Sequence, residues 1–169
     1  CNLAKKYGIY VIEDCSQAHG AQINGKSVGS FGDVSVWSFC QDKIISTVGE
    51  GGMLTTNSKE IYEKVWSFRD HGKTKKSMKI TKKSNEFRFV HDKFGSNFRM
   101  TEIQSAIGRI QLSNILETNK TRARNAEILI NTLTSVNCIR IPLPEAKYTH
   151  GWYKFYCYLN FDNLKESWN

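Results

Sequence analysis

Short apolar runs dominate the first third of the chain, and their pattern predicts strands. Residues 9–12 read Ile-Tyr-Val-Ile and lead directly into Glu13 and Asp14. A wholly apolar run that ends in carboxylates is typical of a buried parallel strand with polar groups at its carboxyl end. Three further segments predict strand structure: a small hairpin at 22–28 around Asn24-Gly25, an alternating strand at 33–39, and a strand entered through glycines at 51–56.

Helical spacing replaces this pattern further along the chain. Apolar residues recur at helical intervals over 58–69, and Ser58 is a suitable N-cap. Thr101 begins a second helix, and a longer, polar-faced helix follows over about 116–133. Residues 3–7 resemble the last turn of another helix, and 152–159 predict an aromatic strand without an evident partner. Alternating strands and helices favour an α/β fold.

The net charge of +8 is concentrated in one segment of the 169 residues. Between Lys73 and Arg88 lie seven basic residues and one acid, Glu86, so this segment alone carries +6. A basic loop of this kind is either solvated or meets an anionic substrate or a partner subunit. Nucleic-acid binding is the third alternative, but no zinc-finger spacing or RNA-binding strand motif supports it. We therefore expect no nucleic-acid partner.

The cysteines and histidines predict neither a disulfide framework nor a metal site. Five cysteines are scattered along the chain without a C-x-x-C pair, and four histidines show no paired spacing. This usage is typical of reduced thiols in the cytoplasm. No run approaches the roughly 20 apolar residues of a membrane span, so none is expected. The chain lacks an initiator Met, and its first residues resemble the end of a helix already under way, so we interpret it as a fragment.

Three polar features together suggest a site. Asp14 ends a predicted strand, Ser38 and Lys43 flank a turn after another, and residues 49–52 (GEGG) follow. Singly, each has an ordinary explanation: Asp14 can be a helix-cap or turn residue, Lys43 a surface charge, and the GEGG run a tight turn. In open α/β sheets, however, ligands bind at the carboxyl ends of strands. If both strands belong to one sheet, Asp14 and the 38–43 turn share that rim.

These features belong to three motifs that resemble a known family. Residues 11–21 (VIEDCSQAHGA) resemble the "EDxxQxxGA" signature of the DegT/StrS-type, pyridoxal-phosphate-dependent sugar aminotransferases. Residues 37–43 (WSFCQDK) with the GEGG run resemble that family's cofactor-lysine segment, and residues 95–108 (GSNFRMTEIQSAIG) resemble its "GxNxRMxExQAAxG" motif. The three motifs occur in the family's order and spacing.

The resemblance implies a fold and a division of the chain. The fold is the α/β PLP-transferase fold of aspartate-aminotransferase type (fold type I). Residues 1–114 would form the later part of the PLP-binding large domain, and 115–169 the linking helix and the start of a smaller C-terminal domain. The parts that hold the cofactor phosphate at a helix N-terminus and stack on its ring would precede this stretch. We therefore expect the stretch alone to bind pyridoxal phosphate weakly or not at all.

The resemblance also implies roles for five residues. Lys43 would bond covalently to pyridoxal 5′-phosphate and move the substrate proton, which requires an environment that depresses its pKa. Asp14 would pair with the pyridine nitrogen, Gln17 would hydrogen-bond near the ring oxygen and Ser38 would contact the phosphate. Asn97 would reach the phosphate of a neighbouring subunit. A purely structural role remains open for Gln17, Ser38 and Asn97, as it does for His19 and Arg99.

The implied activity is transfer of an amino group, typically from glutamate, to a nucleotide-linked keto-sugar for surface-glycan or related synthesis. The enzyme would be a cytoplasmic homodimer with a shared active site. Lys43 argues against the related dehydratases, which carry histidine there, while Val48 departs from the small residue expected before GEGG. The alternative is a catalytically incomplete fragment that serves only as a structural or dimerisation module. The sugar, the carbon aminated and the stereochemistry are not specified by this sequence.

Overall fold

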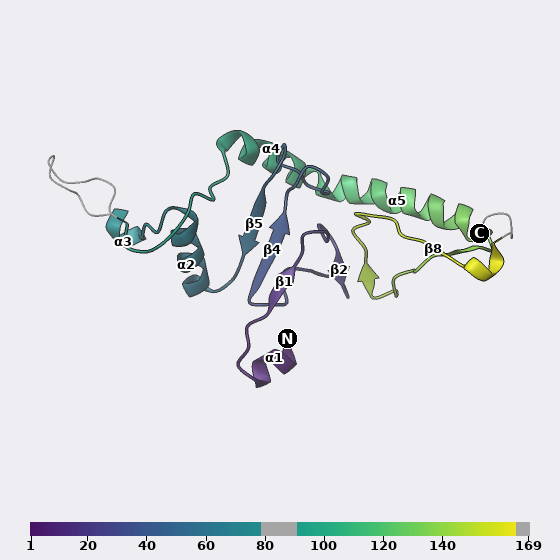
Figure 1. The fold of residues 1–169 in the computed structure, drawn as a ribbon, viewed down its shortest axis with the longest axis horizontal. Helices are drawn as coiled ribbons and strands as arrows, with labels where there is room; N and C mark the ends of the chain where they lie inside the picture. Colours follow the sequence, from purple (N-terminus) through teal and green to yellow (C-terminus); the bar gives the residue numbers. More distant parts are fainter. Residues whose placement is uncertain (79–90, 165–169) are drawn as a thin grey trace.

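The computed structural model describes residues 1–78 and 91–164. A small sheet occupies the centre of an elongated molecule (Figure 1). Helices α2 (Lys59–Arg69) and α3 (Lys75–Met78) lie to one side of it, and α4 (Glu102–Ser113) crosses one end. Helix α5 (Ile115–Leu133) extends the molecule in the other direction, with the C-terminal segment beside it.

The central sheet has the strand order β1-β4-β5. Strand β1 (Ile12–Asp14) runs parallel to β4 (Val34–Ser38), and β5 (Gly52–Thr55) runs antiparallel to β4. The carboxyl ends of β1 and β4 therefore lie on the same rim, as the sequence predicts. This arrangement confirms the condition on which the candidate site depends.

The first strand differs from its prediction in place and in burial. It covers Ile12–Asp14 rather than residues 9–12, and Ile12 is 68% exposed. Within the described ranges 1–78 and 91–164, β1 pairs with β4 alone, which leaves its other edge open. The prediction of a buried strand is therefore wrong for this part of the molecule.

Glycines allow β5 to approach its neighbours closely. A Cβ atom on Gly52 would lie 2.9 Å from the carbonyl oxygen of Trp37, and one on Gly51 would lie 2.1 Å from Thr47 Oγ1. Ordinary side chains do not fit at such distances, so the GEGG run is needed for β5 to pair with β4. The sequence prediction of a strand entered through glycines is confirmed.

The predicted hairpin is also present, and it pairs with a strand from the later part of the chain. Strands β2 (Gln22–Ile23) and β3 (Lys26–Ser27) flank a turn in which Asn24 and Gly25 have φ of 50° and 74°. These angles match the tight two-residue turn that the Asn-Gly pair predicts. Strand β7 (Tyr148–Thr149) adds to the free edge of β2, so the C-terminal segment packs against the N-terminal part.

The helix boundaries follow the local capping signals. Helix α1 (Asn2–Lys6) ends before Gly8, which has φ of 64°. Ser58 accepts a hydrogen bond from the Ile61 N–H at the start of α2. Thr101 and Gln104 form a reciprocal capping box at the start of α4. These ends agree with the predicted ones because capping depends on neighbouring residues in the sequence.

The predicted aromatic strand over 152–159 is mostly absent. Only β8 (Tyr158–Leu159) is extended and paired, and its partner is β6 (Ile139–Arg140); the short η1 turn (Phe161–Asn163) follows. Trp152 has φ of 50°, which turns the chain, and its carbonyl accepts a hydrogen bond from Arg122. The aromatic run therefore serves packing and contacts rather than a continuous strand.

The Glu13 carboxylate holds the loop that precedes β4. It accepts hydrogen bonds from the backbone N–H groups of Gly29, Phe31 and Gly32 at 2.6–2.7 Å. Partial burial opposes ionisation, but these hydrogen bonds outweigh it and hold the pKa of Glu13 below its ordinary value of 4.5. A folded-state pKa that is lowered contributes stability above the unfolded pKa. That stability is lost as the pH falls through the folded pKa.

Replacing Glu13 with alanine should therefore destabilise the protein. Three backbone donors would lose a charged acceptor, which costs about 3 kcal/mol of unfolding free energy near neutral pH. Urea unfolding of the complete protein measures the difference, and Glu127→Ala on the exposed side of α5 is the matched control. The difference should shrink as the pH falls through the Glu13 pKa; equal stabilities at neutral pH would contradict the role assigned to Glu13.

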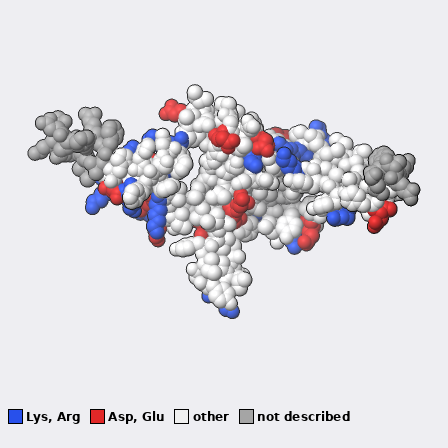
Figure 2. Space-filling view, viewed as in Figure 1, with Lys and Arg blue, Asp and Glu red and all other residues white. Residues whose placement is uncertain are grey.

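Many large apolar side chains are exposed on the described surface. They include Tyr7, Ile9 and Tyr10 before β1, and Ile103 and Ile110 on α4. Figure 2 shows that Lys, Arg, Asp and Glu cover only scattered parts of this face. Exposed apolar area on this scale is typical of a face that packs against further protein.

The described residues include no group of metal-ligating side chains and no helix that could cross a bilayer. All five cysteines lie within the described part, and all five are free thiols.

Candidate active site

Asp14 stands at the shared rim of β1 and β4. The next residue, Cys15, donates its N–H to the Val36 carbonyl at 2.9 Å, which keeps the two strand ends in register. Asp14 Oδ1 accepts the Ser16 N–H at 3.0 Å. Hydrogen bonds from the Ser16 side chain and backbone lower the pKa of Asp14, and the Lys43 charge lowers it further. An exposed, ionised carboxylate therefore stands within the electrostatic reach of Lys43.

Lys43 lies on the turn after β4 and contacts the C-terminal segment. Its Nζ donates a hydrogen bond to Tyr153 Oη at 3.4 Å and lies 4.7 Å from the centre of that ring. The Tyr153 hydroxyl in turn donates to the Asp42 carboxylate, and Lys154 Nζ lies 4.0 Å from that carboxylate. A chain of contacts thus runs from the lysine amine through Tyr153 to Asp42.

This network sets the protonation of the free lysine. Desolvation alone would lower the pKa of Lys43, but the Tyr153 hydrogen bond and the charges of Tyr153 and Asp42 outweigh it and raise the pKa above 10.5. The expectation of a depressed pKa is therefore wrong for the free amine of this structure. The reason is the carboxylate and phenol beside it, which stabilise the ammonium form.

Ser38 and Gln17 flank the same rim. Ser38 ends β4 opposite Gly52, and its Oγ accepts the Cys40 N–H at 3.4 Å. Gln17 follows β1 and is exposed. The rim therefore carries a carboxylate, a hydroxyl, an amide and an amine at or just after the ends of two neighbouring strands, a set of charged and hydrogen-bonding groups suited to a charged, ring-containing ligand.

Asn97 belongs to a different cluster of contacts. It forms an isolated backbone bridge with Asp70 after α2, and its Oδ1 accepts a hydrogen bond from Arg99 Nε at 3.1 Å. Arg99 and Lys73 form ion pairs with Asp70 at 2.9 and 3.3 Å. The structure thus shows Arg99 as an ion-pair residue and places Asn97 beside it, among contacts that include neither Lys43 nor Asp14.

His19 lies behind the rim in an aromatic environment. Its ring centre is 5.4 Å from that of Trp37 and 5.9 Å from that of Phe39. Within the described part of the chain, neither ring nitrogen has a hydrogen-bond partner of normal geometry. Burial lowers the pKa of His19 despite the opposing effect of the Ser38 backbone, so the ring is favoured in its neutral form. These contacts fit a core histidine.

Two members of the lysine network were not identified from the sequence. The sequence pattern predicts only a strand for Tyr153, which lies 110 positions from Lys43 along the chain but contacts it directly in the structure. For Asp42, the only indication in the sequence of a role near Lys43 is that the two residues are adjacent. Val48, the departure from the family pattern, has φ of 61° and is exposed. A β-branched residue is strained in this region, which explains why a small residue is expected there.

Comparisons with known proteins give a consistent result. Residues 1–167 match the DegT/DnrJ/EryC1/StrS aminotransferase family. Over 94% of its length the chain is 36% identical to a UDP-N-acetyl-3-dehydro-alpha-D-glucosamine 3-aminotransferase of Acidithiobacillus ferrooxidans, of which it covers 39%. Over 80% of its length it is 38% identical to a GDP-perosamine synthase of Escherichia coli O157:H7, of which it covers 35%.

A solved structure agrees with the fold as well. An aminotransferase from Psychrobacter cryohalolentis superposes with a TM-score of 0.88 at 42% sequence identity, over 99% of this chain and 44% of that one. The chain thus spans about two fifths of the length of the relatives that it matches.

Proposed function

The chain belongs to the DegT/DnrJ/EryC1/StrS aminotransferase family and has the α/β, fold-type-I architecture of its solved members, and we propose that its protein transfers an amino group to a nucleotide-linked keto-sugar. The cofactor of this proposal is pyridoxal 5′-phosphate, and the donor is an amino acid, typically glutamate. The observation that carries the proposal is the shared rim of β1 and β4, where Asp14, Ser38 and Lys43 meet.

The residues at this rim fit the cofactor chemically. When bound, pyridoxal phosphate supplies a carbonyl that reacts with amines and a ring that accepts electrons. Lys43 offers the amine, and Asp14, ionised and in its electrostatic reach, offers the carboxylate for the ring nitrogen. Ser38 offers a hydroxyl for the phosphate and Gln17 an amide for the ring oxygen. These four roles remain proposals, as does the division at residue 114.

In this proposal Lys43 performs two tasks. It holds the cofactor covalently, and as a free amine it takes the proton from the substrate carbon and returns it to another carbon. Tyr153 accepts a hydrogen bond from the protonated amine, and Asp42 accepts one from Tyr153. The protonated form that Lys43 reaches after taking the proton is therefore stabilised in place.

We further propose a cytoplasmic homodimer in which Asn97 reaches the cofactor phosphate of the partner. The position of Asn97 outside the Lys43 cluster supports this assignment, as do the exposed apolar side chains on α4. Five free thiols suit a reducing compartment. The competing proposal is a structural or dimerisation module without activity, and intact Lys43 and Asp14 argue against it.

The direct experiment uses the complete protein with pyridoxal phosphate, glutamate and a panel of nucleotide-linked keto-sugars. Mass spectrometry should detect an aminated sugar and 2-oxoglutarate in equal amounts. Dimer formation without product from any member of the panel would favour the structural module instead.

Replacing Tyr153 with phenylalanine should shift the pH dependence of cofactor uptake. Only the neutral amine of Lys43 reacts with the cofactor carbonyl, and Tyr153 helps to keep that amine protonated to higher pH. The uptake rate of cofactor-free protein rises with pH, and this rise should occur at lower pH in Tyr153→Phe. Stopped-flow absorbance measures it, with exposed Tyr156→Phe as the control. Superimposable pH profiles for the wild type and Tyr153→Phe would contradict the proposed network.

A further inference from the structure

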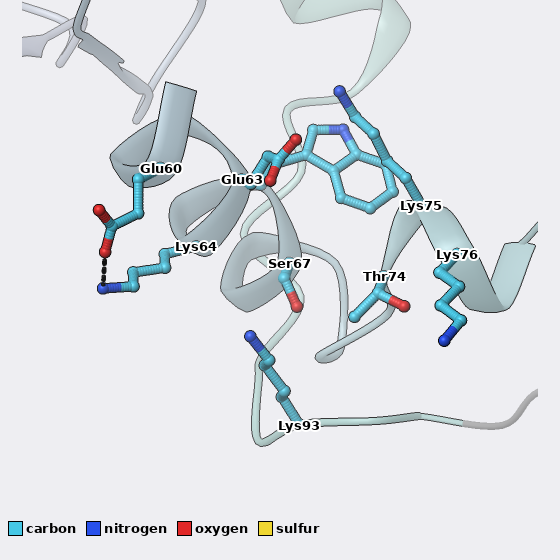
Figure 3. Close-up of a pocket in the computed structure, with 9 residues that line it drawn as sticks. Glu60, Glu63, Lys64, Ser67, Thr74, Lys75, Lys76 and Lys93 are labelled. Carbon is cyan, nitrogen blue, oxygen red and sulfur yellow. Dashed lines mark hydrogen bonds and ion pairs between the residues drawn. The ribbon is translucent and has the colours of Figure 1, made fainter. Parts of the chain in front are cut away.

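A hollow of about 430 Å³ lies between α2, α3 and the chain at Lys93 (Figure 3). Its volume is in the range of small-molecule sites. Four lysines, two glutamates, two hydroxyl side chains and the indole of Trp66 line it. In Figure 1, α2 and α3 lie beyond β5, whereas Lys43 contacts the C-terminal segment. The hollow is therefore not part of the rim described above.

Ser67 places an unused hydroxyl at this hollow. The residue is only 3% exposed, and within residues 1–78 and 91–164 its hydroxyl has no hydrogen-bond partner. Its carbonyl, by contrast, accepts the N–H groups of Asp70 and Gly72 at 3.1 and 2.8 Å. A buried hydroxyl without a partner is unfavourable, so Ser67 Oγ is suited to a polar group that enters the hollow.

Among the described residues, two of the four lysines have a charged or aromatic partner and two form no ion pair. Lys64 is paired with Glu60 at 2.6 Å, and the Lys75 ammonium lies 4.7 Å from the centre of the Tyr62 ring. In the part of the chain that the structure describes, Lys76 and Lys93 form no ion pair. Figure 3 shows the Lys93 ammonium and the Ser67 hydroxyl directed toward one another across the hollow.

The backbone around Gly72 holds Lys93 against the end of α2. The Lys93 N–H donates to the Gly72 carbonyl at 3.2 Å, and Gly72 has φ of 73°. A Cβ atom on Gly72 would lie 1.7 Å from the Lys93 carbonyl oxygen. Only glycine permits this approach, so the main chain holds the Lys93 backbone close to the end of α2.

We propose that this hollow binds the phosphate group of a sugar phosphate or nucleotide, with Lys76, Lys93 and Ser67 contacting the phosphate oxygens. Phosphate brings the negative charge and acceptor oxygens that two ammonium groups and one hydroxyl require. Glu63 lies on the other side of the hollow from Lys93 in Figure 3, and the Trp66 indole is also part of the lining. A carboxylate accepts hydrogen bonds from sugar hydroxyls, and an indole packs against a sugar ring or a base.

The two possible sources of the phosphate give different consequences. If it belongs to the nucleotide-linked sugar, the inference rests on the proposed function and the hollow is a substrate subsite. If it belongs to a separate phosphorylated metabolite, the hollow is an independent site. Lys79, Lys82, Lys83 and Arg88 of the basic segment lie outside the described residues, so the proposal uses none of them.

Binding is tested by calorimetry on the complete protein with its cofactor bound, with inorganic phosphate, glucose 1-phosphate and uridine diphosphate as probes. At least one phosphate ester should bind, and more weakly at high salt. The double variant Lys76→Ala/Lys93→Ala should lose about tenfold or more in affinity, and Ser67→Ala a smaller amount, about threefold. Lys59→Ala, an exposed lysine of α2 outside the hollow, should change affinity by less than about twofold.

The outcomes separate this proposal from the proposed function. No binding of any probe, or equal affinities of the wild type and the double variant, would overturn the phosphate site even in an active aminotransferase. If a nucleotide-linked sugar displaces the phosphate ester, the site is a substrate subsite. If both bind together, it is an independent site, and this result stands even if the protein transfers no amino group.

Discussion

Replacing Lys43 with alanine should remove both the covalent attachment of pyridoxal phosphate and nearly all amino transfer in the complete protein. Among the described residues, Lys43 is the lysine whose charge lowers the pKa of Asp14, whereas Lys154 Nζ lies 4.0 Å from Asp42 and 4.9 Å from the centre of the Tyr153 ring. Loss of both the nucleophile and the proton carrier should lower kcat by more than about a thousandfold.

Two measurements identify the cause of that loss. The visible absorption of the covalently held cofactor should disappear, and added methylamine should restore a fraction of the turnover by supplying an amine. The control is Lys120→Ala, an exposed α5 lysine paired with Glu117 at 2.7 Å, which should leave kcat unchanged. Retained absorption and turnover in Lys43→Ala would show that another lysine performs the chemistry.

Local signals predicted helix starts well and strand extents poorly. Ser58 and Thr101 cap α2 and α4 where the sequence places them, because each cap is a contact across three residues. The extent of β1 and of the aromatic run at 152–159 depends on partners distant in the chain. A period of two or a run of apolar residues does not reveal whether such a partner is present.

For the site, too, the sequence predicted the residues that follow strand ends but not those brought close by distant parts of the chain. Asp14, Ser38 and Lys43 follow strand ends, and parallel pairing of β1 with β4 brings those ends together. Tyr153 was not predictable as a contact of Lys43, since no sequence periodicity links positions 110 residues apart. The raised pKa of Lys43 depends on that contact and on Asp42, so its direction could be known only from the folded chain.

Replacing Asp14 with asparagine should have the second-largest effect, a loss of kcat of about a hundredfold or more with the cofactor still attached to Lys43. Asparagine keeps the size of the side chain and an acceptor oxygen for the Ser16 N–H, but it lacks the charge that keeps a ring nitrogen protonated. The electron-accepting capacity of the ring would fall, whereas its covalent attachment depends on Lys43.

A variant that restores the charge distinguishes this electrostatic role from a structural one. Hydrogen bonds from Ser16 and the Lys43 charge hold the pKa of Asp14 below 3.8, so the wild-type carboxylate stays charged throughout the mildly acidic range. Asp14→Glu, which restores the charge, should recover part of the activity that Asp14→Asn loses. A merely structural residue would respond in the opposite order, because asparagine preserves the shape better than glutamate does. Greater activity in Asp14→Asn than in Asp14→Glu would therefore exclude a carboxylate–ring pair at this rim.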